Sequence, residues 1–183
     1  MVRKLKHHEG KLLKKVDFLD WKNDSSLREI KVMRRYHVQD REDYRKYNKL
    51  SGLATKLVAR LKQLPPDDPF RVDLSERMLN KLYQTGLIAT TSSMAKAEKL
   101  AVSAFCRRRL PVVMVRLKMS ETLKEAVTFI EQGHIRVGPE TVTDPAFLVT
   151  RSMEDFVTWS DSSKIKRTIM RYNDKLDDYD LLE

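Results

Sequence analysis

The stretch from Arg107 to Trp159 constrains the fold more than any other, because two short helical patterns and an alternating strand follow one another in it. Apolar residues at steps of three and four predict a first helix that starts around Pro111 and ends near Met119. Thr122 and Glu125 have the spacing of a capping box, which predicts the start of a second helix. The expected apolar stripes are Leu110, Val113, Met114 and Leu117 in the first helix and Leu123, Ala126, Val127 and Ile130 in the second. These matched stripes predict a helix pair.

A strand begins directly after Gly133, which is expected to end the second helix. Its residues alternate, so that Ile135 and Val137 face one side while His134 and Arg136 face the other. A turn at 138–140 follows, and further short strands are expected at 141–142, 147–150 and 156–159. The predicted fold class is therefore α+β, with a helix pair packed on a small, strongly bent antiparallel sheet.

The remaining chain reads mostly as helix. We divide it into a basic N-terminal arm (1–39), a helical region (40–106), the segment 107–160 described above and a C-terminal tail (161–183). A long helix is expected at 41–63, ended by three prolines, with further helices at 74–85, capped by Gly86, and at 94–100, whereas 101–106 could be a helix end or a short strand. The apolar stripe expected on the long helix is Tyr47, Leu50, Leu53, Leu57, Leu61 and Leu64. A second helix within the arm is expected from Leu27.

The positive charge is concentrated in the first third of the chain. Residues 1–66 hold 18 Lys and Arg against 8 Asp and Glu, which accounts for the whole net charge of +10. This asymmetry favours a polyanion such as nucleic acid over a merely solvated helix. The candidate contacts of the arm are Lys4, Lys6, Lys11, Lys14, Lys15, Arg34 and Arg35. Phe18 and Trp21 could stack on bases or anchor the arm on protein, and the sequence does not separate these two roles.

A second set of polar and basic residues lies within the helix pair and the strand. It consists of Arg107, Arg108, Arg109, Arg116, Lys118, Thr122, Lys124, His134 and Arg136. Their placement predicts one basic groove between the helix pair and the hairpin, although each charge alone could be an ordinary solvated side chain. The three consecutive arginines precede a helix rather than forming a core pattern. We therefore expect their replacement by alanine to weaken nucleic-acid binding with little loss of folding.

These motifs together resemble the S4-type RNA-binding domain, named after a small-subunit ribosomal protein. The resemblance rests on Arg109-Leu110, on the sequence TLKEA from Thr122, and on GHIRV from Gly133, and it covers about 107–160. Three features depart from the family pattern. Leu123 stands where the family often has Arg, a Gly-Pro-Glu-Thr tip replaces the usual Asn-Gly hairpin, and 152–155 replaces a later Gly-Asp turn.

A second resemblance covers nearly the whole chain. The sequences REDYRKYNKL, LPPDDPFR, CRRRLPVVM and FIEQGHIRVGPE are similar to the S4-domain subunits of the U3 small nucleolar ribonucleoprotein. This resemblance implies a nucleolar protein that binds the U3 small nucleolar RNA and pre-ribosomal RNA and promotes their pairing. It also implies docking on a large scaffold protein of the small-subunit processome.

Two other functions are weighed against this one. The S4-type module also occurs in structural proteins of the small ribosomal subunit and attached to enzymes such as pseudouridine synthases. Residues 1–106 are too short for such a catalytic domain, and we expect no catalytic residues, cofactor, metal or small-molecule substrate. The sequence has no P-loop, no apolar run long enough to cross a membrane and a lone cysteine, Cys106, expected to be buried. The tail could be a docking helix or a frayed terminus.

Overall fold

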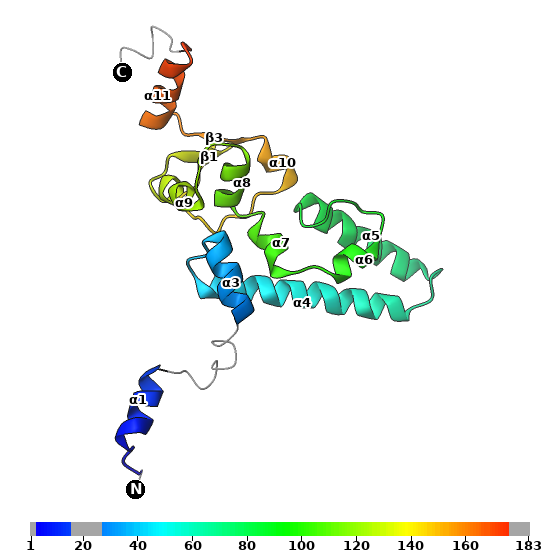
Figure 1. The fold of residues 1–183 in the computed structure, drawn as a ribbon. Helices are drawn as coiled ribbons and strands as arrows, with labels where there is room; N and C mark the ends of the chain where they lie inside the picture. The colour runs from blue at the N-terminus through cyan, green and yellow to red at the C-terminus, as the bar shows by residue number, and fades with distance from the viewer. Residues whose placement is uncertain (1–2, 16–26, 176–183) are drawn as a thin grey trace.

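The computed structural model describes residues 3–15 and 27–175, and it has the expected α+β composition (Figure 1). The N-terminal helices are α1 (His7–Lys15), α3 (Leu27–Tyr36), α4 (Arg41–Gln63), α5 (Pro69–Gln84), α6 (Met94–Glu98) and α7 (Val102–Cys106). The later elements are α8 (Leu110–Arg116), α9 (Leu123–Glu131), β1 (Ile135–Val137), β2 (Glu140–Thr141), α10 (Arg151–Glu154), β3 (Val157–Trp159) and α11 (Lys164–Tyr172). Phe18, Trp21 and the acidic end of the tail lie outside the described residues.

Helices α3 to α7 form a helical layer around α4, the longest helix in Figure 1. Helix α5 returns beside α4, and the short α6 packs on both. Val58, Leu79, Ile88 and Ala97 form the buried cluster between them. Helix α5 starts five residues earlier than expected, because the Asp68 carboxylate accepts a hydrogen bond from the backbone N–H of Phe70 and Pro69 suits the first turn.

The buried face of α4 differs from the predicted leucine stripe. Its buried residues are Tyr47, Ser51, Val58 and Leu61, whereas Leu50 and Leu53 are exposed. The reason is that α6 and α7 cover the side of α4 that carries Ser51 and Val58. The hydroxyl of Thr55, on the same side, donates a hydrogen bond to the Glu98 carbonyl at 3.4 Å.

The expected arm is divided in the structure. Helix α1 has no buried residue, but α3 packs against α4 and belongs to the helical layer. Val38 is buried in a cluster with Tyr47, Phe105 and Cys106, and Val32, Met33 and Tyr36 of α3 cover that cluster. Buried Glu29 accepts a 2.8 Å hydrogen bond from Arg41 of α4. Residues 27–38 are therefore part of the core rather than a separate arm.

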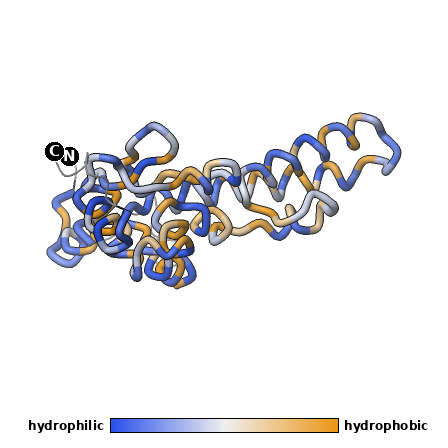
Figure 2. Tube along the Cα trace, turned by 90° about the horizontal axis from the view of Figure 1, so that it is seen from above, coloured by the Kyte–Doolittle hydropathy of each residue, from blue (hydrophilic) through white to orange (hydrophobic). Residues whose placement is uncertain are grey.

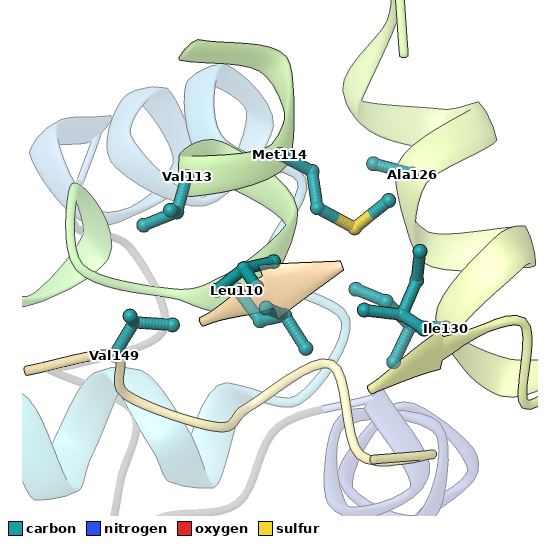
Figure 3. Packing of buried hydrophobic residues seen from close by; sticks show 8 residues of the cluster. Leu110, Val113, Met114, Ala126, Ile130 and Val149 are labelled. Carbon is teal, nitrogen blue, oxygen red and sulfur yellow. The ribbon is translucent and has the colours of Figure 1, made fainter. Parts of the chain in front are cut away.

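The helix pair α8–α9 packs on a three-stranded antiparallel sheet of order β2-β1-β3, in which Arg136 pairs with Thr141 on one side and Thr158 on the other. The capping box is confirmed, since Thr122 and Glu125 exchange both hydrogen bonds, and Gly133 ends α9 with φ of +73°. Figure 3 shows the side chains of this core converging from α8, α9 and the segment before α10. The buried residues are Leu110, Val113, Met114, Ala126, Ile130, Ile135, Val149 and Val157. Leu117, expected in the stripe, is 40% exposed because α8 ends at Arg116.

The strand expected at 147–150 is instead one antiparallel bridge between Leu148 and Arg109. The N–H of Leu110 donates to the Phe147 carbonyl at 2.9 Å, and the N–H of Val149 donates to the Arg108 carbonyl at 2.8 Å. This segment therefore pairs with the start of α8, and the chain then turns into the short helix α10.

The tail forms helix α11, which Ser163 caps and which has no buried residue. Polar and apolar residues interleave along the whole described trace in Figure 2. None of the helices in that part of the chain is long and apolar enough to cross a membrane.

Candidate RNA-binding site

The three consecutive arginines before α8 have different environments. Arg107 is exposed, whereas Arg108 and Arg109 are only 6% and 2% exposed. Because Arg109 ends the turn after α7 and its backbone bridges to Leu148, its side chain is directed into the boundary between the helical layer and the helix pair.

Arg109 forms a buried ion pair across this boundary. Its Nη1 lies 2.9 Å from a carboxylate oxygen of Asp43 in α4 and donates to the Tyr47 hydroxyl at 3.4 Å. The Tyr47 hydroxyl in turn donates to the Ala146 carbonyl at 3.4 Å. Burial raises the pKa of Tyr47, and the Arg109 charge partly opposes this shift. The phenol therefore stays a neutral donor.

Arg108 lies at the same boundary but forms its hydrogen bonds with residues that follow it in the chain. Its Nε donates to the Val149 carbonyl at 2.8 Å, and its Nη1 pairs with Glu154 of α10 at 2.9 Å. Gly86 lies directly beside it, since a Cβ at Gly86 would come within 2.8 Å of the Arg108 guanidinium. Gly86 also has φ of +75°, so this position favours glycine for two reasons.

A third arginine, Arg151 of α10, completes the contact between the parts. Its Nε and one Nη donate to the carbonyls of Tyr83 and Ile88, each at 2.9 Å. Its guanidinium carbon also lies 4.2 Å from the centre of the Tyr83 ring. We call the contacts of Arg108, Arg109 and Arg151 the arginine junction.

The expectation that the three arginines before α8 are peripheral is therefore wrong for Arg108 and Arg109. Both lie inside the protein and are held by carboxylates, because Asp43 and Glu154 converge on them through the tertiary fold. Within the described part of the chain, their removal would leave nearly buried Asp43 with only Lys46 at 4.0 Å, and Glu154 with Arg116 alone. Of the three, only Arg107 presents its guanidinium at the surface.

The turn between α8 and α9 presents a group of exposed polar side chains. Lys118 has φ of +60° at the end of α8, Thr122 caps α9, and Lys124 lies in its first turn. Arg116 is half exposed and shares the Glu154 carboxylate with Arg108. The Thr122 hydroxyl accepts the Glu125 N–H, so it has a structural role at this site.

His134 and Arg136 lie elsewhere, on the side of β1 opposite to buried Ile135. Arg136 donates to the Thr158 hydroxyl and pairs with Asp161, which also binds Lys166. Lys166 lowers the pKa of Asp161 by hydrogen bonding.

The imidazole of His134 is held by its neighbours. Its Nδ1 lies 3.1 Å from the hydroxyl of buried Ser163, and its ring meets that of Phe129 edge-on. The hydrophobic core fills the space between the helix pair and the sheet. The basic groove expected between the helix pair and the hairpin stays a prediction, with Lys118 and Lys124 at the turn before α9 and Arg136 on β1 as its exposed or half-exposed cations.

Arg107 belongs to another surface, which the sequence did not reveal. It lines a hollow of about 440 Å³ together with Arg28, Lys31 and Arg35 of α3. Arg28 and Lys31 were not among the predicted contacts, although residues 28, 31 and 35 have the spacing of one helix face.

The basic residues of the N-terminal segment are exposed. Lys4 and Lys6 precede α1, and Lys11, Lys14 and Lys15 belong to it. Arg34 is an exposed residue of α3. Glu9 accepts hydrogen bonds from Arg3 and from the Lys6 N–H, which fixes the first turn of α1. The charges of α1 are thus presented to solvent on an ordered helix.

Within residues 3–15 and 27–175, no group of three His, Cys, Asp or Glu side chains is placed to hold a metal ion. Burial raises the pKa of the Cys106 thiol to about 11. Cys106 is therefore a protonated core residue.

The fold and these basic surfaces define an S4-domain protein. The family description "Ribosomal protein S4/S9 N-terminal domain" matches residues 4–107, and "S4 domain" matches residues 108–155. The chain is 59% identical to the U3 small nucleolar ribonucleoprotein protein IMP3 of Saccharomyces cerevisiae, over 98% of this chain and 99% of that protein. The Homo sapiens protein of the same name is 58% identical over 99% of each chain. The chain therefore belongs to the IMP3 family.

More distant similarity extends to ribosomal proteins. The small ribosomal subunit protein uS4 of Picrophilus torridus is 27% identical over 78% of this chain and 79% of its own length. The S4-type resemblance inferred from the sequence motifs is thus confirmed.

Proposed function

We propose that this protein is a non-catalytic RNA-binding subunit of a U3 small nucleolar ribonucleoprotein. The observation that carries the proposal is the 59% identity, along essentially the full length of both chains, with a protein named as part of that particle. The matched S4 domain and the exposed cations support RNA as the ligand. The proposal places the protein in the nucleolus, in early processing of small-subunit ribosomal RNA.

We further propose that the protein promotes base pairing between the small nucleolar RNA and pre-ribosomal RNA. Two complementary strands repel each other through their phosphates, and Lys and Arg side chains relieve this repulsion by displacing counterions. Two of the exposed basic surfaces could act in this way: the turn with Lys118 and Lys124, and helix α1 with Lys11, Lys14 and Lys15. Such pairing consumes no nucleotide. A large scaffold protein of the particle is the proposed protein partner.

An annealing assay tests this role. Two complementary RNA strands, one from the small nucleolar RNA and one from pre-ribosomal RNA, carry donor and acceptor dyes. The full chain is expected to accelerate pairing without ATP, and a Lys118→Ala/Lys124→Ala variant should accelerate it less. Lys81→Ala/Lys96→Ala on α5 and α6 removes the same charge elsewhere and serves as the control. Equal pairing rates with and without the protein would overturn the annealing role.

The distant similarity to uS4 favours one alternative, a structural protein of the mature small subunit. Cell extracts separated on a sucrose gradient distinguish the two. The proposed function predicts that the protein cosediments with U3 small nucleolar RNA in precursor particles. Recovery in salt-washed mature subunits would support the alternative instead.

A further inference from the structure

The hollow beside Arg107 adjoins a second hollow of different chemistry. The first, which we call the cationic hollow, lies between α3 and α7. It is lined by Arg28, Lys31, Val32, Arg35, Tyr36, Ser103 and Arg107. The second, the neutral hollow, has a volume of about 300 Å³. It is lined by Arg28, Val32, Tyr44, Asn48, Ser51 and the segment 100–102. Because Arg28 and Val32 line both, the two hollows are neighbours along α3.

The cationic hollow brings together four positive side chains with no carboxylate among its lining residues. In the described part of the chain, none of the four forms an ion pair with Asp or Glu. Like charges gathered in a concave site repel one another, so a bound anion would be stabilised there. A phosphate group has the charge and the acceptor oxygens that Arg and Lys bind.

The neutral hollow provides hydrogen-bonding groups and an aromatic ring instead. The Asn48 amide is exposed and makes no side-chain hydrogen bond to another described residue, so its donors and acceptor are available. Tyr44 presents a half-buried ring, and its phenol stays protonated, since burial and then the Glu29 charge raise its pKa. An amide edge beside an aromatic ring is suited to a planar base.

Both hollows are held open by the core beneath them. Val32 and Tyr36 pack on the buried cluster that contains Phe105 and Cys106, and α3 is tied to α4 by Glu29 and Arg41. The walls are thus fixed before a ligand arrives, which lowers the entropic cost of binding. The volumes of the two hollows lie within the range of small-ligand sites, about 300–1,000 Å³.

We infer that the two hollows form a site for one RNA nucleotide extruded from its helix, with the backbone phosphate in the cationic hollow and the base in the neutral hollow. This inference rests on the proposed function as an RNA-binding protein and names which RNA feature is recognised. A phosphorylated peptide would occupy the cationic hollow alone and leave Tyr44 and Asn48 without a role.

The test compares two labelled RNA hairpins that differ only by one unpaired adenosine in the stem. Fluorescence anisotropy with the full chain is expected to show about tenfold tighter binding of the bulged hairpin, as one stacked and hydrogen-bonded base allows. Asn48→Ala and Tyr44→Leu should remove most of this preference and leave affinity for the uninterrupted hairpin unchanged. Both variants keep the charge, and circular dichroism confirms their folding.

A second variant probes the phosphate. Arg28→Ala/Lys31→Ala should weaken binding of the bulged hairpin more than that of the uninterrupted one, whereas Lys81→Ala/Lys96→Ala should weaken both equally. If the wild type binds neither hairpin, the proposed function itself fails. If it binds both with equal affinity, only the nucleotide site is overturned. Competition by a phosphoserine peptide without any bulge preference would overturn it in favour of a protein ligand.

Discussion

The arginine junction and the cationic hollow are built from the same kinds of residue, and they differ in what surrounds each charge. At the junction, Arg109 faces Asp43 and Arg108 faces Glu154, and both guanidinium groups are buried. Arg107 precedes Arg109 by only two residues. It lies in the cationic hollow beside Arg28, Lys31 and Arg35. At the junction, carboxylates of the protein itself neutralise the arginines. In the hollow, the cationic side chains can instead bind an external anion. An arginine-rich sequence can therefore serve stability and binding in neighbouring positions.

The largest expected effect is at Arg109. Among the described residues, Arg109→Ala leaves nearly buried Asp43 with only the exposed Lys46 at 4.0 Å, which should lower the free energy of unfolding by about 3 kcal/mol. Urea denaturation measures this loss. Replacing both members, as in Arg109→Met/Asp43→Leu, should cost much less, because no unpaired charge remains. A loss in the double variant as large as in the single one would show that the ion pair is not the cause.

Gly86→Ala should have the second-largest effect. The new Cβ would contact the Arg108 guanidinium, and the residue would keep a left-handed conformation, so we expect a loss of about 2 kcal/mol. Gly138→Ala is the matched control, since its φ is +63° but nothing lies within 4 Å of the added Cβ. Thermal unfolding of both variants separates the conformational cost from the contact with Arg108. Equal losses would show that the junction tolerates the added methyl group.

Cys106 lies beneath the hollow and close to the junction. Its buried thiol is expected to make the free energy of unfolding depend on pH. Burial raises the pKa of its thiol to about 11, so the folded protein holds a proton that the unfolded chain releases above its ordinary pKa. The stabilising contribution is complete below that ordinary value and is lost as pH rises towards 11. Relative to Cys106→Ala, the wild type should lose about 1 to 2 kcal/mol between pH 8 and pH 10. Parallel stability curves for the two proteins would contradict the shift.

The smallest effect on stability is expected at Arg107. Arg107→Ala removes an exposed charge, so unfolding should change by less than about 0.5 kcal/mol. Its effect should appear in RNA binding, where the slope of log affinity against log salt falls by about 0.7 for one lost contact with a single strand. Anisotropy titrations at several salt concentrations measure this slope. A large loss of stability with an unchanged slope would place Arg107 with the junction instead of the hollow.

The parts of the fold that local sequence determines were predictable. The capping box of Thr122 and Glu125, the left-handed Gly133 and the alternation around Ile135 involve residues a few positions apart. The environments of Arg108 and Arg109 depend on Glu154 and Asp43, which lie 46 and 66 residues away in the sequence. No local pattern reports such partners, so the two arginines could not be distinguished from Arg107.

The same limit explains the leucines of α4 and the neutral hollow. Leu50 and Leu53 fit a helical stripe, but which face is buried depends on where α6 and α7 pack. The role of Asn48 could not be predicted from local sequence, because the hollow that it lines forms only when α3 and the segment 100–102 lie beside α4. Arg28, Lys31 and Arg35 were recognisable from their spacing as one basic face.

The arginine junction has a further consequence for how the protein can present RNA. The backbone crosses between the helical layer and the helix pair once, near Arg107, yet the side chains of Arg109 and Arg151 bind across that boundary at separate points, and Arg108 packs against Gly86 there. These contacts restrict bending between the two parts. Two RNA segments bound on either side of this boundary would therefore be held at a fixed distance from each other. Each would then meet the other at a high effective concentration.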